Sequence, residues 1–181
     1  MNDLAGWFTV ACWVFYTGAL ALSQKAGDED RRSGRLLWAC TIGALVTGGI
    51  LAAAGIGAVD GGTWRMAGVA TVWLGLALGE WSRRTLGEHY HPTVATVSAQ
   101  AVVTSGPYRW IRHPIYLARI LSMAGIGMLM GSWAAALLCI AVPAFGFVVR
   151  IRIEEAAMAA ATGGQYERYR RSTKKLLPYL W

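Results

Sequence analysis

The stretch that decides the fold is V-V-T-S-G-P-Y-R-W-I-R-H-P-I-Y, residues 102–116, a polar segment between two apolar halves of the chain. Its Gly106-Pro107 pair is typical of a turn. Pro114 suits the first position of a helix, where its missing N–H costs no hydrogen bond. The pattern predicts a helix that begins at Pro114, with Arg112 and His113 beside its N-terminus. Because helix N-termini and cationic side chains both favour negative charge, we expect a small site for a carboxylate or another anion here.

The composition indicates a membrane protein. The 181 residues are 55% hydrophobic and only 15% charged, with a mean hydropathy of +0.40, which is too apolar for an ordinary soluble domain. The length predicts one domain over residues 1–181. The net charge of +7 would also suit nucleic-acid binding. However, the positive residues lie in blocks beside apolar segments, so membrane topology explains them better.

Five apolar segments predict membrane-spanning helices, since a span needs about 20 residues. The segments are residues 4–22, 36–59, 64–79, 115–130 and 133–149. Only Gly131-Ser132 separates the last two, which predicts a tight helical hairpin. We therefore expect an all-α, multi-pass bundle, in which residues 1–79 form three spans and residues 80–181 form a cytoplasmic cap, the hairpin and a C-terminal tail.

Lysine and arginine predict the orientation of the bundle. Of the 17 such residues, 15 fall between spans one and two, between spans three and four, or in the tail. Arg65 falls on the other side, and Arg119 lies within a span. The positive-inside rule then places the N-terminus outside and the C-terminus in the cytoplasm, as five spans require. The membrane would be the plasma or inner membrane of a prokaryote, or the endoplasmic reticulum of a eukaryote.

Two polar regions are expected to cover the cytoplasmic side. Residues 79–113 are too long for a mere connector and predict an ordered cap. Residues 150–161 should continue the fifth span as a helix that Gly163-Gly164 ends. The remaining tail, with Tyr166, Tyr169 and a basic run at 170–175, predicts an interfacial segment that lies against anionic lipid headgroups.

Several polar residues allow either a structural or a functional interpretation. His113 alone fits a structural role at the helix start as well as a ligand-binding role. Arg119 could reach the interface, pair with a carboxylate or line a cavity, and we favour an ion pair. Glu154 and Glu155 stand four and three residues after arginines, as ordinary pairs on a helix surface do.

The chain carries no convincing metal or nucleotide signature. His89 and His91 are two residues apart, with only Glu88 nearby, which does not match a metal site. An odd number of widely spaced cysteines within apolar segments predicts packing residues rather than disulfides; these are Cys12, Cys40 and Cys139. The sequence has no P-loop, dinucleotide fingerprint or nucleophile elbow.

Three segments resemble the isoprenylcysteine carboxyl methyltransferase family and its phospholipid methyltransferase relatives. They are L-G-E-H-Y-H-P-T-V (86–94), Q-A-V-V-T-S-G-P-Y-R-W-I-R-H-P-I-Y (100–116) and R-I-R-I-E-E-A-A-M-A-A-A-T-G-G-Q-Y-E-R-Y (150–169). Their most specific parts are G-x-Y-x-x-x-R-H-P-x-Y and E-E-x-x-M-x-x-x-x-G-x-x-Y-x-x-Y. The resemblance covers roughly the C-terminal half. It implies a membrane-embedded methyltransferase that uses S-adenosylmethionine without a Rossmann domain.

The resemblance also implies where the site lies. The cofactor pocket in the cap would comprise residues that match the family motif, closed by the tail around Glu154 and Glu155: Gln100, Val102, Val103, Gly106, Pro107, Tyr108, His113, Pro114 and Tyr116. Arg112 and Arg150 would hold a carboxylate acceptor, whereas an amine acceptor needs Glu155 or His113 as a base. The chain departs from the family pattern at Gln100, Ala118 and Thr162, which leaves the acceptor open.

We therefore expect an enzyme that transfers a methyl group to a small lipidic acceptor, either an isoprenylcysteine-like carboxylate or a phospholipid amine. The reaction demands alignment and exclusion of water and needs neither a metal nor a nucleic acid. Two alternatives stay open. The scaffold also resembles the C-terminal part of sterol reductases that use NADPH, and the chain could be a non-catalytic membrane protein that binds a lipid.

Overall fold

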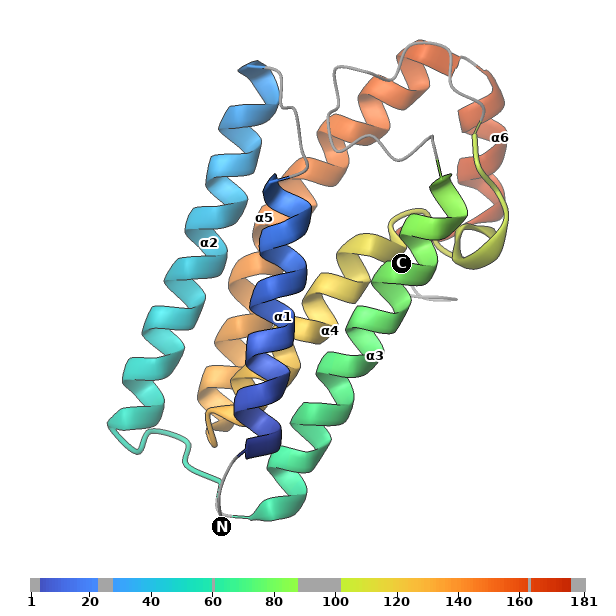
Figure 1. Ribbon diagram of the computed structural model, residues 1–181. Helices are drawn as coiled ribbons and strands as arrows, with labels where there is room; N and C mark the ends of the chain where they lie inside the picture. Colours follow the sequence, from blue (N-terminus) through green and yellow to red (C-terminus); the bar gives the residue numbers. More distant parts are fainter. Residues whose placement is uncertain (1–3, 23–27, 60, 88–101, 163, 177–181) are drawn as a thin grey trace.

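The computed structural model describes residues 4–22, 28–59, 61–87, 102–162 and 164–176. Within these ranges every regular element is helical, and the helices form an elongated bundle (Figure 1). The α-helices are α1 (Leu4–Leu22), α2 (Asp28–Ala53), α3 (Gly62–Leu86), α4 (Pro114–Leu129), α5 (Trp133–Thr162) and α6 (Gly164–Ser172), and the 3-10 helix η3 (Gly106–Arg109) precedes α4. The prediction of an all-α fold is confirmed.

The helix that begins at Pro114 is found as the sequence indicates. Proline occupies the first turn of α4, directly after His113. At the other end of α4, Gly131 adopts a left-handed conformation with φ of 72°, which reverses the chain within a few residues. The Ser132 hydroxyl accepts a hydrogen bond from the N–H of Ala135 at 3.1 Å and donates one to the carbonyl of Ile56 at 2.7 Å. The predicted helical hairpin of α4 and α5 is therefore confirmed.

Three predicted helix boundaries are wrong. The second apolar segment was expected to begin at residue 36, but α2 begins at Asp28. The second apolar segment was expected to run to residue 59, but α2 ends at Ala53, because Gly55 and Gly57 take positive φ angles of 71° and 67° that a helix does not allow. The third segment was expected to end at residue 79, but α3 continues to Leu86. In this extension Arg84 pairs with Glu80 four residues earlier at 2.7 Å, the spacing that supports a helix.

Small residues allow the helices to approach closely. The most extensive contact in the bundle joins α3 and α4, where a methyl group added to Gly75 would lie 2.6 Å from the carbonyl oxygen of Ala118. Between α4 and α5, a methyl group added to Gly127 would lie 2.4 Å from the Cα of Ala136. Cys139 is buried in the adjoining core, as predicted for a packing residue.

We expect the substitution Gly127→Ala to destabilise the bundle by about 1–3 kcal/mol, because the added methyl group collides with helix backbone that cannot move aside. The matched control is Gly43→Ala in α2, where an added methyl group meets nothing within 4 Å and helix propensity favours alanine. Thermal unfolding in detergent micelles would measure both. Equal midpoints for the two variants would contradict this packing.

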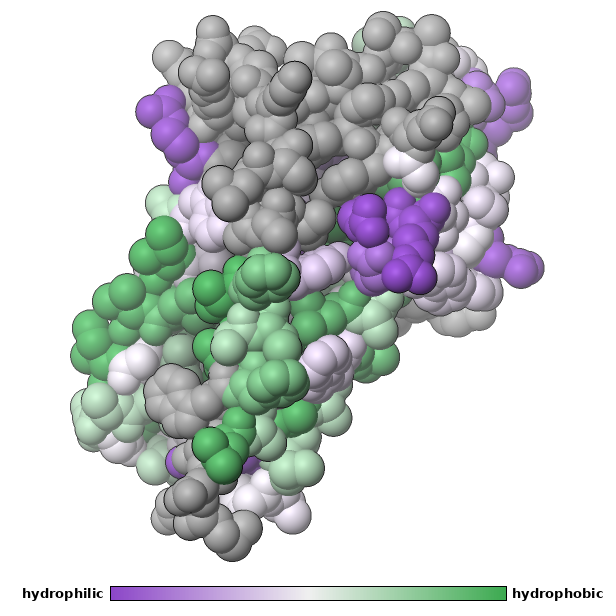
Figure 2. Space-filling view, viewed as in Figure 1, coloured by the Kyte–Doolittle hydropathy of each residue, from purple (hydrophilic) through white to green (hydrophobic). Residues whose placement is uncertain are grey.

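The surface of the bundle is suited to lipid. Among the residues that the structure describes, two helical segments are long and apolar enough to cross a membrane, Arg35–Ala53 of α2 and Trp133–Thr162 of α5. Large hydrophobic side chains are exposed on several helices, for example Phe15, Leu74 and Phe145. Figure 2 shows hydrophobic residues along most of the length of the bundle and most of the hydrophilic residues near the end that carries α6. The 30 residues of α5 span about 45 Å, which is longer than a hydrocarbon core of about 30 Å.

Candidate active site

The segment before α4 is held by the C-terminal tail. Backbone hydrogen bonds run from the N–H of Arg112 to the carbonyl of Lys174 at 2.8 Å and from the N–H of His113 to the carbonyl of Lys175 at 3.0 Å. These bonds form a short parallel pairing around Ile111 and Lys174. The tail therefore lies against the start of α4 and fixes the position of Arg112 and His113.

At this junction the side chains of α4, of the residues before it and of α5 form one polar cluster. Its members are Arg112, His113, Tyr116, Arg150, Glu154 and Glu155, joined by the ion pairs and hydrogen bonds described below. The two halves of the cluster lie about 40 residues apart in the sequence. The structure thus brings together the three residues expected to be catalytic, Arg112, Arg150 and Glu155.

Arg112 is the best-anchored member of the polar cluster. Its Nε donates to Oε1 of Glu155 at 2.9 Å, and its Nη1 donates to the carbonyls of Arg170, at 3.0 Å, and Thr173. The side chains of Arg112 and Glu155 are only 6% and 11% exposed. Most donors of this guanidinium are therefore used to join α5 and the tail to the start of α4.

A second set of bonds surrounds Glu154. Oε1 of Glu154 accepts a hydrogen bond from the Tyr116 hydroxyl and another from Nε of Arg150 at 3.1 Å. Arg150 also donates to the Tyr116 hydroxyl at 3.0 Å. The ring of Tyr116 stacks on Phe147, with ring centroids 4.9 Å apart. This packing and bonding fix the orientation of the phenol.

His113 lies between the two carboxylates. Its Nε2 is 3.4 Å from Oε1 of Glu155, and its Nδ1 is 3.7 Å from Oε2 of Glu154. The Nζ of Lys175 lies 3.7 Å from the other oxygen of Glu155. Lys175 belongs to the segment that we expected to bind lipid headgroups, so its place beside the polar cluster was missed. With Arg112 and Arg150, it gives the site three fixed positive charges against two carboxylates.

Glu155 is held ionised by its neighbours. Burial acts to raise the pKa of this carboxyl, but hydrogen bonds from His113 and Arg112 stabilise the carboxylate and bring its pKa down to about 2. The ionised group therefore binds protons only in strong acid. It is a weak base and a strong partner for cations.

This depressed pKa predicts how stability depends on pH. The contribution of Glu155 is complete above its ordinary pKa of 4.5 and is lost as the pH falls toward 2. We expect a loss of roughly 3 kcal/mol over this interval, measured as a fall in the unfolding midpoint. In the variant Glu155→Gln the fall should be smaller, because glutamine does not titrate. If the unfolding midpoints of the wild type and Glu155→Gln fall in parallel with pH, the depressed pKa of Glu155 is contradicted.

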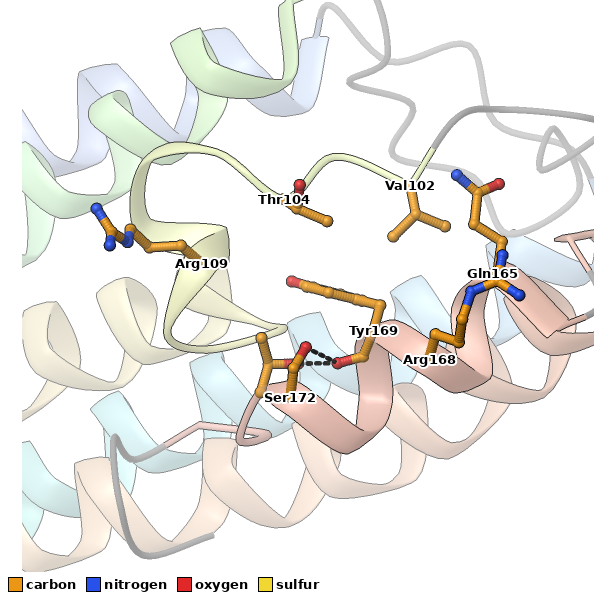
Figure 3. Close-up of a pocket in the computed structure, with 8 residues that line it drawn as sticks. Val102, Thr104, Arg109, Gln165, Arg168, Tyr169 and Ser172 are labelled. Atoms are coloured by element: carbon orange, nitrogen blue, oxygen red, sulfur yellow. Dashed lines mark hydrogen bonds between the residues drawn. The ribbon is translucent and has the colours of Figure 1, made fainter.

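A pocket of about 370 Å³ adjoins the polar cluster, between the loop before η3 and α6 (Figure 3). It is lined by Val102, Thr104, Arg109, Gln165, Arg168, Tyr169, Ser172 and Thr173. Thr173 connects the two features, since its carbonyl accepts a hydrogen bond from Arg112. No carboxylate lines the pocket among the described residues, and its volume falls within the range of small-molecule sites.

The other residues expected to bind the cofactor are distributed unevenly. Val102 lines the pocket. Pro107, Tyr108 and Pro114 are buried in the packing around the loop, and Val103 and Gly106 are partly buried in the same loop without lining the pocket. Gln100 lies outside the described residues, as do Glu88, His89 and His91.

The two tyrosines of the tail are buried within the protein. Tyr166 and Tyr169 are only 3% and 8% exposed. The hydroxyl of Tyr169 donates to the carbonyl of Tyr108 at 2.7 Å, so α6 packs against η3 rather than presenting its aromatic side to a membrane.

The part of the chain from residue 68 to residue 160 matches the isoprenylcysteine carboxyl methyltransferase family. This match covers slightly more than half of the 181 residues and includes both halves of the polar cluster. The chain belongs to this family. The isoprenylcysteine carboxyl methyltransferase match ends within α5, so α6 and the tail that hold Arg112 lie beyond it.

Three named relatives also match part of the chain. The chain is 38% identical over 73 residues to methanethiol S-methyltransferase of Mycobacterium tuberculosis, which is 40% of this chain and 28% of that protein. It is 34% identical over 79 residues to protein-S-isoprenylcysteine O-methyltransferase of Schizosaccharomyces pombe, 44% of this chain and 34% of that protein. It is 33% identical over 79 residues to cobalt-zinc-cadmium resistance protein CzcN of Cupriavidus metallidurans, 44% of this chain and 36% of that protein. The chain thus matches about a third of the length of these relatives.

Proposed function

We propose that this chain is a membrane-embedded methyltransferase that moves the methyl group of S-adenosylmethionine to a small lipidic acceptor. The observation that carries the proposal is the polar cluster at the N-terminal end of α4, where Arg112 and Glu155 form a buried pair at 2.9 Å. The cluster lies inside the region that matches the methyltransferase family. The acceptor would be an isoprenylcysteine-like carboxylate or a phospholipid amine.

The residues of the polar cluster fit such a cofactor. When bound, S-adenosylmethionine supplies an electrophilic methyl group, whose bond to the positively charged sulfur breaks with its electron pair on sulfur as the acceptor atom bonds to the carbon. Glu154 and Glu155 are the carboxylates that would lie near the sulfonium, and both already pair with arginines. The rings of His113 and Tyr116 stack with centroids 5.7 Å apart, and the adjoining pocket of about 370 Å³ has room for a small molecule.

The geometry assigns different roles to the residues expected to be catalytic. The N–H groups of Arg112 donate hydrogen bonds to Glu155 and to two carbonyls of the tail, so we assign it a positioning role. Arg150 donates from Nε to Tyr116 and Glu154, and we propose that it also contacts the acceptor. For an amine acceptor, His113 is the better base, because the depressed pKa of Glu155 makes that carboxylate a poor proton acceptor.

We propose a single membrane domain of five spans with the polar cluster on the cytoplasmic side. The orientation follows from the excess of lysine and arginine at the end of the bundle that carries α6. A cytoplasmic mouth suits the reaction, because the cofactor is water-soluble and the acceptor lies in the membrane. Cysteine-accessibility labelling in sealed vesicles, at a cysteine introduced in place of the exposed Ser172, would test this orientation. Labelling from the lumenal or periplasmic side would overturn it.

The decisive experiment is transfer of a tritiated methyl group from S-adenosylmethionine into a lipid extract by the purified protein. We expect a labelled lipid, whose identity names the acceptor. Thermal shifts separate the alternatives. S-adenosylhomocysteine at a hundredfold excess over its dissociation constant should stabilise the protein by about 2.7 kcal/mol, and NADPH should not. Stabilisation by NADPH alone would support a reductase, and no stabilisation by either ligand would support a non-catalytic lipid-binding protein.

A further inference from the structure

Arg119 is a charged residue inside an apolar helix, and the cluster described above does not include it. It stands five residues after Pro114 in α4, about 7.5 Å along the axis at 1.5 Å per residue. It follows Tyr116 by three residues, one turn deeper on the same side of the helix. Its positive charge also acts on the Tyr116 hydroxyl. Arg119 therefore lies next to the polar cluster, on the side toward the membrane interior.

The face of α4 that carries Arg119 is turned into the bundle. Met123 and Ile126 follow it by four and seven residues, the spacing of one helix face, and they are only 2% and 4% exposed. They pack in the core with Ala44 of α2, Val72 of α3 and Cys139 of α5. Arg119 itself is half-buried. Arg119 therefore stands on the side of α4 that faces the bundle, above that core.

Within the ranges that the structure describes, Arg119 has no ion pair or hydrogen bond. The ion pair favoured from the sequence is thus not found among these residues. A charged side chain within a span is costly unless it is paired or used. The other two arginines near the site are already engaged, Arg112 with Glu155 and Arg150 with Glu154. An anion brought by a ligand would complete the coordination of Arg119.

We propose that Arg119 binds the oxyanion of the lipidic acceptor and so determines acceptor specificity. The inference rests on the proposed function. For an isoprenylcysteine-like acceptor the oxyanion is the carboxylate itself, held one turn from Tyr116. For a phospholipid amine it is the phosphate, which a two-carbon linker separates from the amine, a spacing comparable to one helical turn of about 5.4 Å. In both cases the apolar chain extends along α4 toward the membrane interior.

The test measures KM and kcat for two acceptors, N-acetyl-S-farnesylcysteine and dioleoylphosphatidylethanolamine, with full-length protein in lipid nanodiscs. Whichever of the two acceptors the wild type methylates shows whether the oxyanion of the acceptor is a carboxylate or a phosphate. We expect Arg119→Gln to raise KM for that acceptor by about 10- to 100-fold, as loss of a charged hydrogen bond implies. The kcat and the affinity for S-adenosylhomocysteine should change by less than about threefold, and Arg119→Lys should recover most of the KM. The matched control is Arg152→Gln, which removes one charge from an exposed site on α5 and should leave KM unchanged.

The outcomes separate this inference from the proposed function. If the wild type methylates neither these acceptors nor a lipid extract, the proposed function fails. If it methylates one of them and Arg119→Gln leaves KM unchanged, the proposed function stands and the inference is wrong. The side chain of Arg119 then only extends to the membrane interface. A large fall in the unfolding midpoint of both Arg119→Gln and Arg119→Leu would also overturn the inference, because it would reveal a partner within the protein.

Discussion

Replacing Arg112 by alanine will abolish methyl transfer and destabilise the protein by about 3–5 kcal/mol, the cost of leaving one partner of a buried ion pair uncompensated. The substitution removes the 2.9 Å contact with Glu155 and both side-chain bonds to the tail carbonyls. The tail then loses its attachment to the start of α4. Methyl transfer and thermal unfolding on the same preparation would measure the two effects.

A double-mutant cycle of Arg112→Ala and Glu155→Gln measures the coupling energy between these two side chains. Because both variants break the same contact, the double variant should be less destabilised than the sum of the single ones, by about 1–3 kcal/mol. The control is Arg152→Gln, which also removes one positive charge, but from an exposed position on α5. Additive effects of the two substitutions, or normal turnover in Arg112→Ala, would show that the buried pair is not needed for the site.

The substitution His113→Ala will weaken the binding of S-adenosylhomocysteine by about 5- to 100-fold, as loss of a charge-assisted hydrogen bond predicts. His113 lies 3.4 Å from Glu155 and stacks on Tyr116, so its loss leaves a gap between the two carboxylates. Isothermal titration calorimetry in nanodiscs would measure the affinity. The backbone of the tail should stay paired, because His113 holds Lys175 through its main-chain N–H.

The variant His113→Gln serves as the comparison, since glutamine keeps a donor and an acceptor of similar reach. It should retain more of the affinity than alanine and lose turnover with an amine acceptor, for which no base would remain. An unchanged affinity in His113→Ala would place the cofactor elsewhere, and the 370 Å³ pocket lined by Arg168 would then be the next site to test.

Local sequence signals were sufficient for the elements that position the site. The start of α4 follows from the ring of Pro114, and the hairpin follows from Gly131, whose φ of 72° suits glycine. The wrong boundaries have equally local causes. Hydropathy alone does not distinguish the end of α2 from the apolar turn at Gly55 and Gly57, and it ends α3 at residue 79 although Glu80 and Arg84 support further helix.

The partners within the site were not predictable in the same way. Arg150 and Glu154 stand four residues apart on one helix, and spacing alone allowed only an ordinary surface pair. Both residues bond to Tyr116, which lies 34 residues before Arg150. Likewise, two tyrosines on one side of a short helix fit a membrane surface or a protein surface equally well. The contact of Tyr169 with Tyr108, 61 residues earlier, depends on how the tail returns to the bundle.

The proposed function requires that residues 106–116, Glu154 and Glu155 form one ligand-binding site. Hydrogen–deuterium exchange of the protein in nanodiscs, with and without saturating S-adenosylhomocysteine, tests it directly. We predict slower exchange in peptides that cover residues 106–116 and 150–158, and unchanged exchange in peptides from α2. Protection in only one of the two segments, or in neither while the ligand is bound, would contradict a shared site.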